Sequence, residues 1–138
     1  MKNFDSYRII NIIFTGVIGL VFIYSCLFLP EGGKHLIPSF YTDMTGNTSP
    51  SLGLSRAFSA LVRADVVLAN QFNPYAARIF AFFCFQFLFR LISIKLDSFP
   101  VINKKTWIWT DILLSISLFL IVFYPLIMFT LDTVGNLF

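Results

Sequence analysis

Residues 9–29 read IINIIFTGVIGLVFIYSCLFL, and this apolar stretch decides the fold. Only Asn11, Thr15, Ser25 and small residues interrupt the run, and Pro30 ends it. A helix of this length, rising about 1.5 Å per residue, crosses a hydrocarbon core of about 30 Å. No small-residue cleavage site ends the run, so we interpret it as a retained membrane anchor.

Two further apolar runs of the same kind follow, at 74–94 and 107–128. Asn73 and Pro74 predict the start of the second helix, because asparagine caps helix N-termini and proline suits the first helical turn. Together with 9–29, these runs predict an all-α integral membrane protein with three transmembrane helices in a single membrane domain covering residues 1–138.

The ends of the third run carry their own signals. Trp107 and Trp109 open it, and amphipathic indole rings favour the membrane–water interface. Pro125 is expected to kink or end the helix, because proline has no backbone N–H to donate and its ring clashes with the preceding turn.

The overall composition agrees with a membrane protein. The chain has 138 residues, of which 57% are hydrophobic and 12% are charged, whereas soluble domains are about 25% charged. Its 18 phenylalanines are too many to hide inside so small a globule. The basic residues are scattered, with Lys104 and Lys105 the only adjacent pair, so we expect the lipid bilayer and no nucleic acid as a partner.

The distribution of basic residues predicts an orientation. Six of them fall on the side of the N-terminus and second loop, and four around the first loop, with none at the C-terminus: Lys2, Arg8, Arg90, Lys95, Lys104 and Lys105, against Lys34, Arg56, Arg63 and Arg78. Since cytoplasmic loops carry the excess of Lys and Arg, we expect a cytoplasmic N-terminus, with the first loop and the C-terminus facing outward.

The first loop, 31–73, is longer than a connection requires, and long loops are usually functional or disordered. Its second half predicts an amphipathic helix at about 54–72, because apolar residues alternate with polar ones at helical spacing. The polar residues Arg56, Ser59, Arg63 and Asn70 are expected on one face of it. Asp65 is a good cap for a second, shorter helix, so one or two helices are expected, lying on the outer surface or against the spans.

A pattern within this loop resembles a known family. Thr45, Gly46, Pro50, Gly53, Arg56 and Ala57 are followed by Ala64 and Asp65, then by Asn73, Pro74 and Tyr75. The order and spacing resemble the bacterial membrane family called domain of unknown function 2752, whose hallmark is a T-G-x-x-C-P-x-C-G-L-T-R-A loop, then G-D, then N-P-L entering a membrane helix. The resemblance implies a shared topology and brings no activity with it.

The chain departs from that family at the two hallmark cysteines, which are Ser49 and Leu52 here. Paired thiols could hold a metal or cycle through a disulfide, and leucine can do neither. The remaining skeleton of Gly53, Arg56, Asp65 and Asn73 is interpreted as architectural. Thiol chemistry is therefore not expected in this chain.

Charged residues in or beside the spans are candidate functional residues, because an unpaired charge is costly in hydrocarbon. Arg90 and Asp111 are predicted on the same side of the membrane and can form an intramembrane ion pair; separate snorkelling of each to its own interface is the alternative. Gln86 is deep in the second span and is expected to bond to a neighbouring helix. The candidate contacts to lipid or a protein partner are Arg56, Arg63, Asp65, Asn73 and Gln86.

Motifs for catalysis are not found in the sequence. It has none of the nucleophile, zinc-protease, phosphate-loop or dinucleotide signatures, so no catalytic, cofactor-binding or metal-binding residue is assigned. His35 is the only histidine and is interpreted as an interfacial residue, while Cys26 and Cys84 are interpreted as packing residues.

Two functional hypotheses follow. The first is a non-enzymatic small subunit or scaffold of a bacterial inner-membrane complex, bound to other integral membrane subunits or to copies of itself. The alternative is a homo-oligomeric pore or small transporter built around the second span, with Arg78, Gln86 and Arg90 facing the path. An enzyme descended from a thiol-dependent ancestor is the third hypothesis and the weakest, because both thiols are replaced.

Overall fold

The computed structural model describes residues 6–30, 51–96 and 103–135 and is helical over most of these ranges, with no strand among them. The elements are α1 (Ser6–Leu27), α3 (Leu54–Val62), α4 (Val66–Phe72), α5 (Ala76–Leu96) and α6 (Lys104–Gly135). The all-α prediction is confirmed, and α1, α5 and α6 are long and apolar enough to cross a membrane. Residues 31–50, including Lys34, His35 and Ser49, lie outside the described part of the chain.

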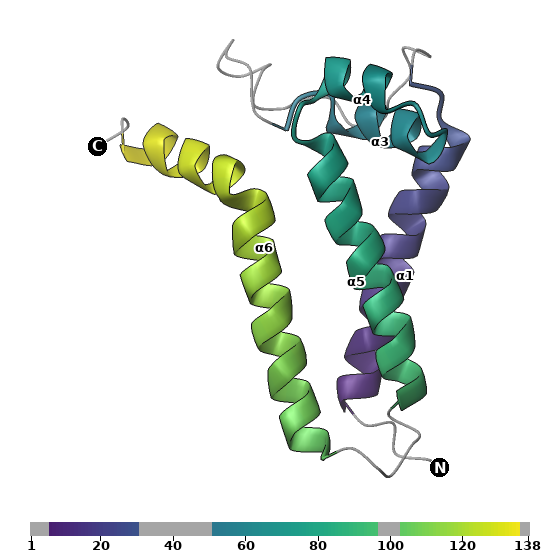
Figure 1. Cartoon of the computed structure of the whole chain (residues 1–138), viewed down its shortest axis with the longest axis vertical. Coiled ribbons are helices and arrows are strands. Elements are labelled where there is room, and N and C mark those ends of the chain that lie inside the picture. The colour runs from purple at the N-terminus through teal and green to yellow at the C-terminus, as the bar shows by residue number, and fades with distance from the viewer. Residues whose placement is uncertain (1–5, 31–50, 97–102, 136–138) are drawn as a thin grey trace.

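The three long helices run side by side over most of their length, as Figure 1 shows. They approach one another at the end where α1 begins and spread apart towards the end that carries α3 and α4. Each begins or ends within a few residues of the predicted runs, except that α6 continues well past residue 128 to Gly135.

The packing of α1 against α5 follows a repeat of seven residues. On α1 the buried positions are Asn11, Ile18 and Ser25. The buried positions of α5 are separated by three, seven, four and three residues, which keeps one stripe facing its neighbour, as in a left-handed helix pair; they are Ala76, Ile79, Gln86, Arg90 and Ser93. This stripe is apolar near α3 and α4 and polar at the opposite end.

The short helices α3 and α4 pack against each other at the end where the long helices are furthest apart. There α3 packs against both α1 and α5. The side chain of Phe58 meets the rings of Phe80 and Phe83 edge-on, with centroids 5.3 and 5.9 Å apart. The fully buried alanines of this core allow the helix backbones to approach closely; they are Ala57, Ala60, Ala69 and Ala76.

The predicted amphipathic helix is divided into two by a left-handed turn. Ala64 has a φ of 62°, and the Asp65 amide donates to the Ala60 carbonyl at 3.0 Å, which closes α3 with a Schellman-type motif. The expected common polar face is therefore wrong in part. Ser59 is fully buried, and Asn70 belongs to α4, beyond the break.

The last helix, α6, packs against α5 and has one buried side chain in its described residues, that of Asp111. Phe119 and Phe123 extend towards α5, where the ring of Phe82 contacts both. Pro125 lies inside the helix, and Figure 1 shows that α6 bends in its C-terminal third, where its last turns point away from the other helices. Proline thus bends this helix without ending it.

Candidate functional site

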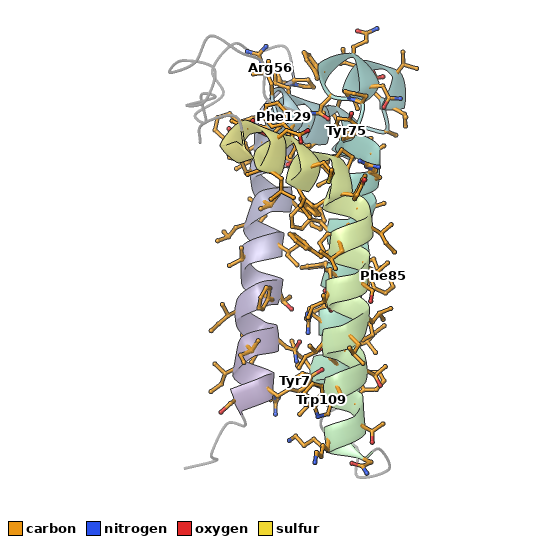
Figure 2. The ribbon with its side chains drawn as sticks, turned by 90° about the vertical axis from the view of Figure 1, so that its left-hand side faces the viewer. Tyr7, Arg56, Tyr75, Phe85, Trp109 and Phe129 are labelled. Atoms are coloured by element: carbon orange, nitrogen blue, oxygen red, sulfur yellow. The ribbon has the colours of Figure 1, made fainter. Side chains whose placement is uncertain are left out.

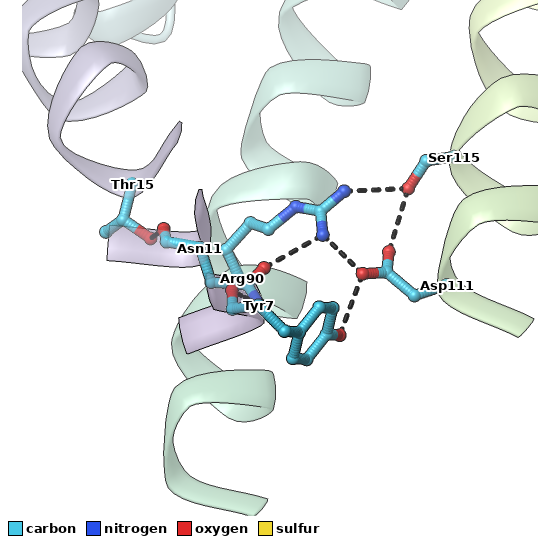
Figure 3. A network of polar contacts seen from close by, with 6 residues as sticks. All are labelled: Tyr7, Asn11, Thr15, Arg90, Asp111 and Ser115. Atoms are coloured by element: carbon cyan, nitrogen blue, oxygen red, sulfur yellow. Dashed lines mark hydrogen bonds and ion pairs between the residues drawn. The ribbon is translucent and has the colours of Figure 1, made fainter. Parts of the chain in front are cut away.

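Three long helices bring a polar cluster together at the end where they converge, and Figure 3 shows its residues. We call this set the polar cluster; it consists of Tyr7 and Asn11 on α1, Arg90 on α5, and Asp111 and Ser115 on α6. The residues pair at helical spacing, Tyr7 with Asn11 and Asp111 with Ser115, so each helix presents its polar groups from one face.

Arg90 is the centre of the polar cluster. Its Nη1 donates to Asn11 Oδ1 at 2.8 Å and to Asp111 Oδ2, and its Nη2 donates to Ser115 Oγ at 3.0 Å. The guanidinium carbon also lies 5.5 Å from the centroid of the Phe14 ring. One side chain on α5 therefore binds groups on both α1 and α6.

Asp111 completes the charge balance of the polar cluster. Its Oδ2 accepts from Arg90 and from the Tyr7 hydroxyl at 2.8 Å, and its Oδ1 accepts from Ser115 Oγ at 3.1 Å. Arg90 is 8% exposed and Asp111 1% exposed, so the two charges neutralise each other away from water. The structure has this ion pair in place of separate snorkelling to the interfaces.

The α1 residues of the polar cluster are held in place by their own helix. Asn11 Nδ2 donates to the Tyr7 carbonyl at 3.0 Å, and Thr15 Oγ1 donates to the Asn11 carbonyl at 2.8 Å. The first bond orients the Asn11 side-chain amide so that its Oδ1 faces Arg90, which needs an acceptor. The cluster thus joins three helices through hydrogen bonds and an ion pair, an arrangement suited to holding them together, although the buried Nε of Arg90 has no partner among the described residues.

Gln86 lies one turn along α5 from Arg90 and is 5% exposed. Its Nε2 is buried and has no hydrogen-bond partner among the residues the structure describes. The interhelical bond expected for Gln86 is therefore not made by that nitrogen within the described chain.

A second group of predicted residues forms the junction between the start of α3 and the start of α5. The Asn73 Nδ2 donates to the Leu52 carbonyl at 2.9 Å, and its Oδ1 accepts from the Tyr75 amide at 2.8 Å. Gly53 has a φ of 75°, and a Cβ there would be 2.5 Å from the Phe72 carbonyl oxygen. Both residues therefore tie chain segments to each other.

Asp65 and Arg63 each cap a helix. Asp65 Oδ1 accepts from the Leu68 amide at 2.9 Å, as expected for the N-cap of α4. Arg63 reaches the other end of α1, where Nη1 donates to the Ser25 carbonyl at 3.2 Å and Nη2 to the Cys26 carbonyl at 2.9 Å. A cation at a helix C-terminus interacts favourably with the helix dipole.

The remaining arginines of this end lie on the surface beside aromatic rings. Arg56 is exposed, with its guanidinium carbon 5.9 Å from the centroid of Phe72. Arg78, also exposed, is 4.9 Å from the centroid of Tyr75. Among the candidate contact residues, Arg56 is exposed on the surface of α3, beside the Phe72 ring.

Sequence reasoning did not identify the roles of Tyr7 and Asn11 in binding the ion pair. Two features of the sequence could have indicated these roles. Tyr7 and Asn11 are four residues apart and so share one face of the helix, and Asn11 is a polar residue inside an apolar run. The described residues contain no group of three or more His, Cys, Asp or Glu side chains able to hold a metal ion.

No family model, curated protein or solved structure matches this chain in the comparisons with known proteins.

Proposed function

We propose that this chain is a non-enzymatic small subunit or scaffold of a bacterial inner-membrane protein complex. The polar groups of its spans are used to join its own helices, with Arg90 binding Asn11, Asp111 and Ser115. At the other end, Arg63, Asp65 and Asn73 bind backbone groups of neighbouring segments. Polar side chains that bind other parts of the same chain support an architectural role for this protein.

The observation that carries the proposal is the exposure of α6. Apart from Asp111, every described side chain of this 32-residue helix is partly or fully exposed, although the helix is strongly apolar. Lipid can cover such a surface, and its apolarity does not drive α6 to associate with other helices, since lipid tails are as apolar as leucine. A packing role therefore needs small or polar groups that face outward within the spans.

Two such groups are present. Ser117 is exposed near the middle of α6, and Gly16 is exposed on α1, where an added Cβ would have no atom within 4 Å. Small residues let helices approach closely, and hydroxyl groups bond across helix interfaces in lipid. Gly16 and Ser117 are the positions at which we place contacts with other subunits.

In the proposed orientation, α1 begins at the cytoplasmic face and α3 and α4 face outward. The support is the excess of Lys and Arg at the end where α1 begins, with Lys95, Lys104 and Lys105 near the connection from α5 to α6. The family resemblance at Gly53, Asp65 and Asn73 is in keeping with a bacterial membrane and is part of this proposal.

The pore or transporter hypothesis takes second place. The pore hypothesis requires Gln86 and Arg90 to face the path. Both are buried inside the bundle of a single chain, whereas a pore formed between copies is lined by residues on the outer surface of each copy. Only Arg78 of the proposed path residues is exposed.

The test is gentle extraction of the tagged chain from its native membrane, followed by size analysis and identification of the proteins that accompany it. The proposal expects foreign membrane subunits at a fixed stoichiometry. Recovery of this chain alone as a uniform oligomer that conducts ions after reconstitution would contradict it and favour the pore.

A pair of variants on α1 sharpens the test. Gly16→Leu fills a position that no atom of the chain occupies, so the fold should tolerate it while a closely packed partner helix should not. Val17→Leu, at the adjacent exposed position, is the matched control. We expect the first variant to lose the accompanying subunits and the second to keep them.

A further inference from the structure

The length of α6 poses a physical problem in a bilayer. The helix has 32 residues, against 22 for α1 and 21 for α5. A straight helix of this length would extend about 48 Å, whereas the hydrocarbon core is about 30 Å thick. Roughly ten residues of α6 therefore exceed what a crossing requires.

The bend at Pro125 divides the helix at the point where the crossing is complete. The part from Lys104 to Tyr124 extends about 31 Å, which matches the hydrocarbon core. Trp107 and Trp109 lie near its start, as rings at an interface do. Proline removes one backbone hydrogen bond and clashes with the preceding turn, so a bend there has a clear cause.

Beyond Pro125, the helix runs at the level of α3 and α4. Figure 1 shows the last turns of α6 directed away from the axis of the bundle, and Figure 2 shows the same turns at the height of Tyr75 and below Arg56. Both views therefore place residues 125–135 in the same layer as the two short helices.

The composition of this segment explains why it should not extend into water. Leu126, Ile127, Met128, Phe129 and Leu131 are apolar, and in a straight helix they would pass beyond the hydrocarbon core. In the bent helix, Leu126 packs against the core at the α3–α4 end, while Met128 is 39% and Leu131 60% exposed. The two exposed side chains need an apolar environment that the described chain does not supply.

Polar groups of the segment fit a boundary between lipid and water. The hydroxyls of Thr130 and Thr133 donate to the Leu126 and Phe129 carbonyls at 2.9 and 2.8 Å, so they need no water. Asp132 is exposed and carries a charge that requires a polar environment. A similar pairing occurs at the start of α4, where Val67 is 72% exposed two residues after the exposed N-cap residue Asp65.

We propose that residues 125–135 of α6 form an interfacial helix that lies in the headgroup layer of the leaflet holding α3 and α4. Leu131 enters the upper acyl chains, and Asp132, about 100° further round the helix, faces the headgroups and water. Met128 lies between these two directions, at the boundary. The partner of this surface is the lipid interface, which accepts apolar and charged groups of one helix at the same time. This inference is independent of whether the chain is a subunit or a pore.

The test measures the depth of single nitroxide labels on the full-length protein in vesicles of phosphatidylcholine and phosphatidylglycerol. Cys26 and Cys84 are first replaced by serine, and cysteine is then introduced one site at a time at Met128, Leu131 and Asp132. Leu113, Ile116 and Leu120, exposed sites on the crossing part of α6, provide the depth calibration. Collisions with oxygen report lipid and those with a water-soluble nickel chelate report water.

The proposal expects depth to change steadily from Leu113 to Leu120 and then to stay nearly constant. The label at Leu131 should lie about 5–10 Å below the phosphates. Accessibility to nickel should rise from Leu131 through Met128 to Asp132, which is the order of the three sites around the helix. A steady rise into water from Leu120 to Asp132 would overturn the proposal, as would exclusion of oxygen from Met128 and Leu131, which would show that protein covers them.

Discussion

The two ends of the helix bundle are held together by different kinds of contact. At the α3–α4 end, side chains bind backbone groups, as when Asp65 caps α4 and Asn73 ties Leu52 to Tyr75. At the converging end, side chains bind one another across three helices, with Arg90 and Asp111 at the centre. At the first end the polar contacts run from side chains to backbone groups, and at the second they run from side chain to side chain.

This difference decides what a substitution does at each end. A backbone acceptor remains in place when a side chain is removed, and it can find another donor or water near the surface. A buried charge whose partner is removed has no such substitute. We therefore expect the polar cluster to be the more sensitive region, and the following changes test the comparison.

The largest effect is expected from Asp111→Ala, which leaves Arg90 buried without its counter-charge. Loss of one partner of a buried pair costs about 3–5 kcal/mol, measured as the free energy of unfolding in lipid bicelles. The double variant Arg90→Met with Asp111→Leu removes both charges and should recover most of that loss. A single variant within about 1 kcal/mol of the parent would show that the ion pair does not hold α6.

Gly53→Ala tests the strongest constraint at the other end. The added Cβ would lie 2.5 Å from the Phe72 carbonyl oxygen, and the φ of 75° disfavours any residue with a side chain. We expect a loss of about 2–3 kcal/mol in the same unfolding measurement. Gly16→Ala, which adds a methyl group in open space, is the control and should change stability little.

Arg63→Met removes the cap that α3 places on the end of α1 while keeping an apolar stem of similar length. The Ser25 and Cys26 carbonyls lose charged donors, so a loss of about 1–2 kcal/mol is expected. Amide hydrogen exchange should increase in the last turn of α1 and remain unchanged around Asn11. Faster exchange at both places would mean that the two ends are not independent.

Ala64→Gly is expected to stabilise the protein. Ala64 has a φ of 62°, which glycine adopts without steric cost, and the resembling family has glycine at this position. Relief of the strain, reduced by the greater freedom of glycine in the unfolded chain, should give a gain of about 0.5 kcal/mol. A loss of stability would mean that packing of the Ala64 methyl group outweighs the backbone strain.

The features that could be predicted from the sequence are those that depend on neighbouring residues. The apolar runs predict the long helices, and Asp65 predicts the break between α3 and α4 because an aspartate caps the turn that follows it. The proximity of Arg90 and Asp111 could be predicted because the sequence places both residues near the same end of consecutive spans.

Apart from the Arg90–Asp111 pair, the features that depend on tertiary packing could not be predicted. The contact of Arg63 with the end of α1 joins residues far apart in the sequence, and no local pattern marks which carbonyls an arginine reaches. The burial of Ser59 depends on α3 turning that face towards α1 and α5. Tyr7 joins the polar cluster because α1 and α6 meet at this end, which the spacing within α1 alone does not indicate.

The convergence of the long helices at one end and their spread at the other give the molecule a tapered outline (Figure 1). In a bilayer, such a shape displaces more lipid area from the leaflet that holds α3 and α4 than from the opposite leaflet. A flat membrane must stretch one leaflet relative to the other to accommodate it, and a membrane that bulges towards the α3–α4 side relieves that stress. Crowding many copies together would therefore favour curvature of one sign.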